Sequence, residues 1–177
     1  MSSVLFLCTG NAARSVFAGA MLGTLRSDVR VETAGTLAVE GLPMSWRTRA
    51  ALEAVGLTPP HHRSRQATRS DLDRADLVVA MAPEHVGWVR RTHPAAGART
   101  STLRHLAGAL GGGPGPLPAR LGGGPGPLAA RLGGLELAAR PVDPGEEIAD
   151  PAGGEVGVFI ACAREVVGLV RRLAELV

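Results

Sequence analysis

The chain has 177 residues, of which 45% are hydrophobic, and this is enough for the core of one domain of ordinary size. The formal net charge is +3, the basic residues are spread along the chain, and only 3% of residues are aromatic. These numbers argue against a nucleic-acid binder with a basic patch or a base-stacking platform, and no apolar run has the length of a membrane span.

The only two cysteines, Cys8 and Cys162, are too few for a disulfide framework. No Cys-x-x-Cys pair or paired histidine spacing suggests a metal cluster, and the short apolar start lacks the features of a signal peptide. We therefore expect a cytoplasmic protein with free thiols, no metal and no cofactor.

Strands and helices are predicted to alternate along the chain. A continuous apolar run at residues 4–7 predicts a buried parallel strand, which loop-forming residues 8–11 and an Ala-, Met- and Leu-rich helix at 12–25 follow. The same criteria predict two further strands, at 29–33 and 75–81. They also predict three further helices: one at 46–55, one that follows the strand at 75–81 and ends at about 91, and one at 155–177. This alternation predicts an α/β domain with a parallel sheet that helices cover.

One segment departs from this pattern, because an 11-residue unit rich in Gly and Pro occurs twice in residues 110–131. The two copies, LGGGPGPLPAR and LGGGPGPLAAR, are too few for a solenoid, and their composition opposes helix and strand. We expect a flexible surface insertion at about 110–140 within a single domain that spans 1–177. A duplication without function explains it more simply than a loop that docks a partner.

The segment from Cys8 to Ser15 has the pattern Cys-x5-Arg-Ser and lies between a predicted strand and a predicted helix. A loop that enters a helix presents unpaired backbone N–H groups, which bind anions together with the helix dipole. Arg14 adds a bidentate cation for phosphate, and the same positive surroundings favour the thiolate form of Cys8. Gly10 is expected to permit the backbone turn, and Ser15 to donate a hydrogen bond to the thiolate.

A buried cysteine at a strand end and a surface arginine would also produce a Cys-x5-Arg pattern. The strand before it and the helix after it favour the phosphate-binding interpretation. Moreover, the run VLFLCTGNAARS resembles the active-site signature of the low-molecular-weight protein tyrosine phosphatase family. Further segments resemble the family in the same order: TAGT at 33–36, HRSRQ at 62–66, ADLVVAM at 75–81 and IADP at 148–151.

The resemblance implies a four-stranded parallel sheet of order 2-1-3-4, flanked by helices, with the phosphate-binding loop after strand 1. It implies that Cys8 attacks phosphorus to form a cysteinyl-phosphate, while Asp150 protonates the leaving oxygen and then activates water. Arg14 and the loop stabilise the charged transition state, and no metal takes part. The implied phosphate-binding residues are Thr9, Gly10, Asn11, Ala12, Ala13, Arg14 and Ser15, with Asn11 holding the loop in shape.

The assignment of Asp150 has a rival, because Asp143 also precedes a proline and Asp-Pro is a common turn dipeptide. We prefer Asp150 because it directly precedes the final long helix, as the resemblance requires. His62 and Arg63 are expected to order the loop beneath the site.

Several positions depart from the family pattern. Ala13 replaces a second cysteine, so the protective disulfide between neighbouring thiols cannot form and Cys8 is expected to oxidise irreversibly. Ala12 replaces a bulky apolar residue, and Ala152 stands where an aromatic residue often follows Asp-Pro, so one wall of the substrate slot is reduced. Trp46 is expected either to stack on the substrate ring or to open its helix and pack on the core.

The sequence therefore predicts a phosphotyrosine-protein phosphatase that acts on a phosphorylated protein. Phosphoarginine or a small phosphomonoester is the alternative substrate, because the family members that act on phosphoarginine also have a small residue at the position of Ala12. Arsenate reduction needs further cysteines to pass oxidation outward, so it fits this chain less well. A catalytically silent phosphate-binding module is disfavoured because Cys8, Arg14, Ser15 and a candidate acid are all present.

Overall fold

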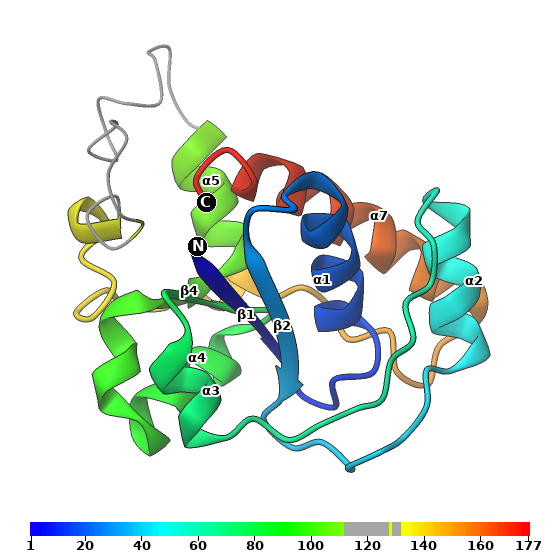
Figure 1. The fold of residues 1–177 in the computed structure, drawn as a ribbon, viewed down its shortest axis with the longest axis horizontal. Coiled ribbons are helices and arrows are strands. Elements are labelled where there is room, and N and C mark those ends of the chain that lie inside the picture. The colour runs from blue at the N-terminus through cyan, green and yellow to red at the C-terminus, as the bar shows by residue number, and fades with distance from the viewer. Residues whose placement is uncertain (112–127, 129–131) are drawn as a thin grey trace.

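A four-stranded parallel sheet forms the centre of the molecule, as the computed structural model shows for residues 1–111, 128 and 132–177 (Figure 1). Its strands are β1 (Ser3–Cys8), β2 (Arg30–Gly35), β3 (Leu77–Ala80) and β4 (Thr100–Thr102), in the order β2-β1-β3-β4. All neighbouring strands pair in parallel, which confirms the predicted α/β class and the strand order 2-1-3-4.

Strand β1 is central because both of its faces are apolar. Val4 and Phe6 belong to one core, and Leu5 and Leu7 to a second core on the opposite face of the sheet. A strand covered on both faces has this continuous run of apolar residues rather than an alternation.

Helices cover both faces of the sheet. On one side lie α1 (Arg14–Leu25), α2 (Trp46–Ala54), α5 (Leu103–Gly111) and α7 (Val156–Leu173), with α7 packed against the other three. On the other side lie α3 (Arg69–Arg74) and α4 (Pro83–Thr92), followed by a 3-10 helix at Pro94–Arg99. None of the described helices is both long and apolar enough to cross a membrane.

One strand and two α-helices were not found from the hydrophobic pattern. Strand β4 has only three residues, all of them Thr or Ser, and α3 is a six-residue polar helix that a capping box of Thr68 and Asp71 initiates. Helix α5 follows β4 directly and was not predicted either. Helix α1 begins two residues later than predicted, at Arg14, because the preceding residues form the candidate phosphate loop.

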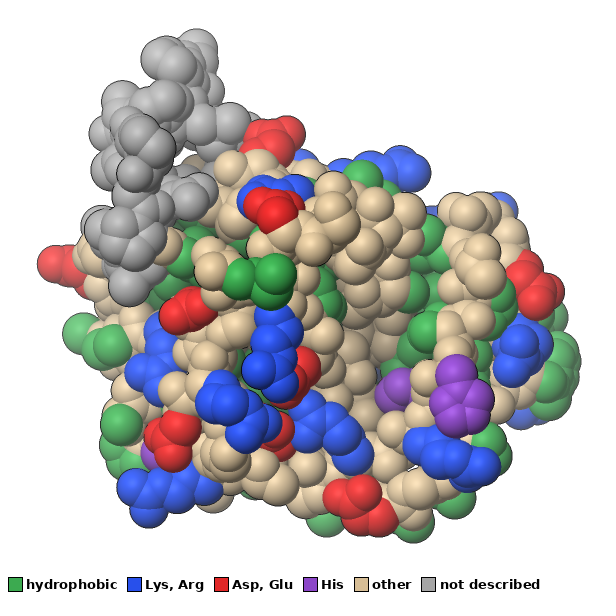
Figure 2. Space-filling model, in the orientation of Figure 1, with side chains coloured by type: hydrophobic (Ala, Val, Ile, Leu, Met, Phe, Trp, Pro, Cys, Tyr) green, Lys and Arg blue, Asp and Glu red, His purple; other side chains and the backbone are tan. Residues whose placement is uncertain are grey.

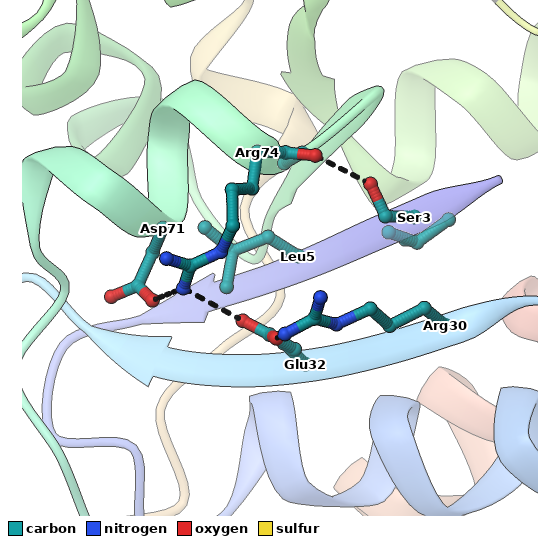
Figure 3. Close-up of a pocket in the computed structure, with 8 residues that line it drawn as sticks. Ser3, Leu5, Arg30, Glu32, Asp71 and Arg74 are labelled. Carbon is teal, nitrogen blue, oxygen red and sulfur yellow. Dashed lines mark hydrogen bonds and ion pairs between the residues drawn. The ribbon is translucent and has the colours of Figure 1, made fainter.

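A cluster of charged side chains joins α3 to the edge of the sheet (Figure 3). Arg74 lies 3.0 Å from Asp71 and 3.9 Å from Glu32 of β2, and its carbonyl oxygen accepts a hydrogen bond from Ser3. These residues line a cavity of only about 10 Å³.

On the face seen in Figure 2, acidic and basic side chains are intermixed rather than separated by sign.

Most of the insertion predicted at about 110–140 lies outside the described residues. The described residues at its end are packed against the domain, because Leu132 and Leu137 are buried in the larger core. Arg140 forms an ion pair with Glu146, whose carboxylate also accepts a 2.6 Å hydrogen bond from Thr102 of β4. These contacts fix the path of the chain toward residues 148–150.

Candidate active site

Cys8 is the last residue of β1 and pairs in register with Gly35 of β2. The segments that follow β1 and β2 also stay close to each other, because Thr36 and Leu37 donate hydrogen bonds of 2.9 and 3.0 Å to the carbonyl oxygens of Cys8 and Thr9. A Cβ atom on Gly35 would lie 2.5 Å from the Thr9 oxygen, which no side chain tolerates. Glycine at this position therefore permits the start of the loop.

Asn11 sets the shape of the loop. Its φ of 51° is in the left-handed region, and its side chain is fully buried. The amide nitrogen donates to Ser15 Oγ and Thr33 Oγ1, both at 3.0 Å, and the amide oxygen accepts from the Arg65 backbone N–H at 3.0 Å. The expectation that Gly10 permits the turn is wrong, because Gly10 does not adopt a positive φ and a Cβ there would meet nothing within 4 Å.

The HRSRQ segment lies beneath the loop. His62 Nε2 and Ser64 Oγ both contact the carbonyl oxygen of Asn11, at 2.7 and 3.0 Å. Burial lowers the pKa of His62, although its contact with this carbonyl opposes the change. Arg63 instead donates to the Gly41 carbonyl, away from the loop. Sequence reasoning thus named His62 but missed Ser64 and Arg65, which bind the same residue.

The loop leads into α1 with its donors free. The backbone N–H groups of residues 10–14 donate to no acceptor in the described part of the chain. Ala13 at the N-cap has no polar side chain that could accept a hydrogen bond from these N–H groups. The loop and the first turn of α1 thus provide the donors of an anion site together with the positive end of the helix dipole.

The Cys8 thiol lies under this loop, next to a buried hydroxyl group. Its Sγ atom is 3.1 Å from Ser15 Oγ, and Cys8 is only 2% exposed. Because Ser15 Oγ already accepts a hydrogen bond from Asn11, its own proton is available to Sγ. A thiolate at Cys8 therefore has a hydrogen-bond donor in place, as the sequence suggested.

Arg14 is buried, with 2% of its surface exposed, and its guanidinium group has fixed partners. It donates to the Ile148 carbonyl at 3.1 Å and to Thr9 Oγ1 at 3.2 Å, and it forms an ion pair with Asp150. The segment that carries Asp150 is held in turn by a 2.9 Å hydrogen bond from the Ile148 N–H to the Met81 carbonyl.

The structure places Asp150 and Asp143 in different settings. Asp150 is 44% exposed, lines the same cavity as Cys8 and Arg14, and accepts a 3.0 Å hydrogen bond from the Ala152 N–H. Asp143 caps a short 3-10 helix by accepting from the Gly145 N–H at 2.8 Å, and it does not line this cavity.

The cavity measures about 420 Å³ and has walls from four parts of the chain. Residues 8–14 form its floor, apart from Asn11, which is buried beneath, and Ala12 and Ala152 line it as expected. Trp46 does not line it and is 61% exposed. The remaining lining residues were not suggested by the sequence: Ser45, Arg47 and Thr48 at the start of α2, Gly153, and Phe159 of α7.

His85 supports the loop from the side of α4. It is 1% exposed, and its Nε2 lies 3.0 Å from the hydroxyl oxygen of Thr9. Burial, with a smaller effect of the Arg14 charge, lowers the pKa of His85 to about 4. Its Nδ1 is buried without a partner among the described residues. No spacing in the sequence pointed to this histidine.

The described residues contain no group of three or more His, Cys, Asp or Glu side chains that could hold a metal ion.

Comparisons with known proteins agree with this geometry. The chain is 30% identical to a protein-arginine-phosphatase from Geobacillus stearothermophilus, over 97% of this chain and 93% of the relative. The solved structure of the YwlE arginine phosphatase from the same organism matches 99% of this chain and 92% of its own with a TM-score of 0.73. A low molecular weight protein tyrosine phosphatase from T. tengcongensis matches with a TM-score of 0.74 and 25% identity over the full length of both chains.

The family model described as low molecular weight phosphotyrosine protein phosphatase matches residues 3–114. This range holds the loop, both strands that position it, and the HRSRQ segment beneath it. The resemblance seen in the sequence is therefore confirmed, and the chain belongs to the low molecular weight phosphotyrosine protein phosphatase family.

Proposed function

We propose that the protein hydrolyses phosphotyrosine in phosphorylated proteins, with Cys8 as nucleophile, Arg14 as phosphate ligand and Asp150 as general acid. One observation carries the proposal: these three side chains line a single cavity whose floor presents the free backbone N–H groups of residues 10–14. A phosphate dianion is the ligand that such a floor suits, because each N–H group and the guanidinium group can donate to its oxygens.

Substrate binding requires one rearrangement. Asp150 forms an ion pair with Arg14, and an incoming phosphate replaces the carboxylate as the partner of the guanidinium group. Arg14 keeps its bond to the Ile148 carbonyl, which orients it toward the loop. The released carboxyl group of Asp150 then lies on the wall of the cavity, where a leaving oxygen emerges.

The reaction takes place in two steps. The Cys8 thiolate attacks phosphorus, the bond from phosphorus to the phenolic oxygen breaks, and Asp150 gives its proton to that oxygen. Water then attacks the cysteinyl-phosphate while the Asp150 carboxylate accepts a proton, and phosphate leaves as the thiolate is restored. The loop N–H groups and Arg14 stabilise the charge on phosphorus in both transition states. Ser15 donates to the sulfur each time it carries charge.

Phosphoarginine is the second candidate substrate. It is favoured by the similarity to the protein-arginine-phosphatase, which covers 97% of the chain, and by the small Ala12 that lines the cavity. The ring of Phe159, which also lines the cavity, favours phosphotyrosine instead, because an aryl group can stack on it. Small phosphomonoesters are compatible with the same floor.

Because Cys8 and Cys162 are free thiols, we place the enzyme in the cytoplasm, where thiols stay reduced.

The test is a comparison of turnover on p-nitrophenyl phosphate, a phosphotyrosine peptide and a phosphoarginine peptide. We expect phosphate release from the phosphotyrosine peptide, and loss of that release in Cys8→Ser. A higher kcat/KM on the phosphoarginine peptide transfers the assignment to the second candidate. No Cys8-dependent release from any of the three substrates refutes the proposed function.

A further inference from the structure

Arg47 is a cation on the wall of the cavity that the proposed reaction does not use. It lies on α2 next to Thr48, whose hydroxyl group donates a 2.9 Å hydrogen bond to the Ala12 carbonyl. This bond ties the start of α2 to the phosphate loop. The position of Arg47 relative to a bound phosphate is therefore fixed by the backbone.

The guanidinium group of Arg47 has no anionic partner in the described part of the chain. Its Nε atom is buried without a hydrogen-bond acceptor, and no ion pair joins it to a carboxylate of the described residues. Arg14, on the same cavity, is by contrast paired with Asp150. An arginine that is partly withdrawn from water and left unpaired favours an anion that a ligand brings.

Trp46 explains how this cation is held. The Arg47 guanidinium carbon lies 5.0 Å from the centroid of the Trp46 ring, within the range of a cation–π contact. The ring therefore supports the arginine side chain rather than the substrate, which accounts for its absence from the cavity wall. Trp46 is a positioning residue in this arrangement.

We propose that Arg47 forms a second anion-binding position beside the phosphate loop and selects phosphopeptides with an acidic side chain next to the phosphorylated residue. Proteins with basic residues at that place are disfavoured by the same charge. The inference rests on the proposed function, because it takes the phosphorylated residue to occupy the floor of the cavity. It adds to that function the charge of the sequence around the phosphate.

The experiment measures binding without turnover, so that it is separate from the test of the reaction. Two phosphotyrosine peptides that differ only in Glu or Gln on both sides of the phosphorylated residue are titrated into the Cys8→Ser protein by fluorescence anisotropy. We expect the Glu peptide to bind about three- to tenfold more tightly, since the arginine is only partly shielded from water. The preference should shrink at high salt, which screens the pair.

Variants of α2 assign the preference to one side chain. In the Cys8→Ser background, Arg47→Gln should bring the ratio of the two dissociation constants to about one, and Arg47→Glu should reverse it. Trp46→Leu should reduce the ratio partway, because the arginine loses its support. Arg49→Gln is the matched control, since Arg49 is exposed on the same helix outside the cavity, and it should keep the full ratio.

Three results overturn the inference: equal binding of the two peptides by the Cys8→Ser protein, a preference that survives Arg47→Gln, or no binding of either peptide. A failure of the proposed function has a different signature, since it is the absence of Cys8-dependent phosphate release. A charge preference in binding that depends on Arg47 stands even then.

Discussion

Acid should destabilise this fold at pH values where carboxylates are still ionised, and His85 is the main cause. The pKa of this histidine is lowered from 6.5 to about 4 in the folded protein, first by burial and then by the charge of Arg14. The unfolded chain therefore takes up a proton between pH 6.5 and 4 that the folded protein does not. The contribution to stability is complete above pH 6.5 and is lost as the pH falls through this window.

The size of the effect follows from the two pKa values. Each pKa unit corresponds to about 1.4 kcal/mol, so protonation of His85 in the unfolded chain alone removes about 2 kcal/mol at pH 5 and about 3 kcal/mol at pH 4. His62 and His105, whose pKa values burial also lowers, act in the same direction. The carboxylates of Asp71 and Glu146 have lowered pKa values and lose their contributions only at more acidic pH.

Urea denaturation at pH 7 and pH 5 measures this loss. The wild-type protein should lose at least about 2 kcal/mol of unfolding free energy between the two pH values. The variant His85→Gln, which keeps a donor near Thr9, should lose about 2 kcal/mol less. His61→Gln removes an exposed histidine and should leave the wild-type loss unchanged. If His85→Gln loses as much as the wild type, the buried neutral state of His85 is wrong.

Three further predictions concern the loop and its thiol. Asn11→Ala should lower the unfolding free energy by about 3–4 kcal/mol, because the three hydrogen bonds of this buried side chain disappear and alanine is strained at positive φ. Asp150→Asn should bind inorganic phosphate about three- to tenfold more tightly, since Arg14 is freed, while kcat falls by a factor of about 100 or more. Peroxide should inactivate Cys8 beyond rescue by thiols, because burial raises the pKa of Cys162 to about 12 and keeps this second thiol protonated.

Each of these has a result that contradicts it. Asn11→Gly should cost about 1 kcal/mol less than Asn11→Ala, and equal losses would mean that backbone strain is not involved. Unchanged inhibition by phosphate in Asp150→Asn would show that the carboxylate does not compete for Arg14. Peptide mass spectrometry that finds a disulfide between Cys8 and Cys162, with activity restored by a reductant, would refute the third.

The elements that depend on the local sequence, strand β1 and the loop that follows it, were predicted well. The run at 4–7 has no polar residue and is directly followed by loop-forming residues, which favoured a short buried strand, and the Cys-x5-Arg spacing placed the loop at its end. The short elements β4 and α3 were not predicted, because strand pairing, capping and ion pairs stabilise them rather than a hydrophobic pattern of their own. Strand β4 is polar and gains its place by pairing with β3, and α3 is held by its capping box and by ion pairs of Asp71.

The substrate wall was predicted least well, because it depends on side-chain directions at a helix start. Trp46 and Arg47 are neighbours in sequence, and neighbouring side chains on a helix point about 100° apart, so only one of the two can face the cavity. The structure places Arg47 there. Phe159 fits the apolar face of α7 in sequence, so nothing distinguished a core role from a place in the wall. His85 carried no signal at all, since its contact with Thr9 joins residues 76 positions apart.

The geometry of the loop is a product of the complete fold rather than of its own eight residues. Asn11 is held in its left-handed conformation by His62, Ser64 and the Arg65 backbone, and Arg14 is oriented by the Ile148 carbonyl 134 positions away. A peptide with the sequence of the loop has none of these partners, so its N–H groups would bind water and its anion site would not exist. The same dependence makes the loop sensitive to changes outside it. A substitution in the HRSRQ segment alters the floor of the cavity without touching the substrate, and it should therefore lower phosphate affinity and stability together.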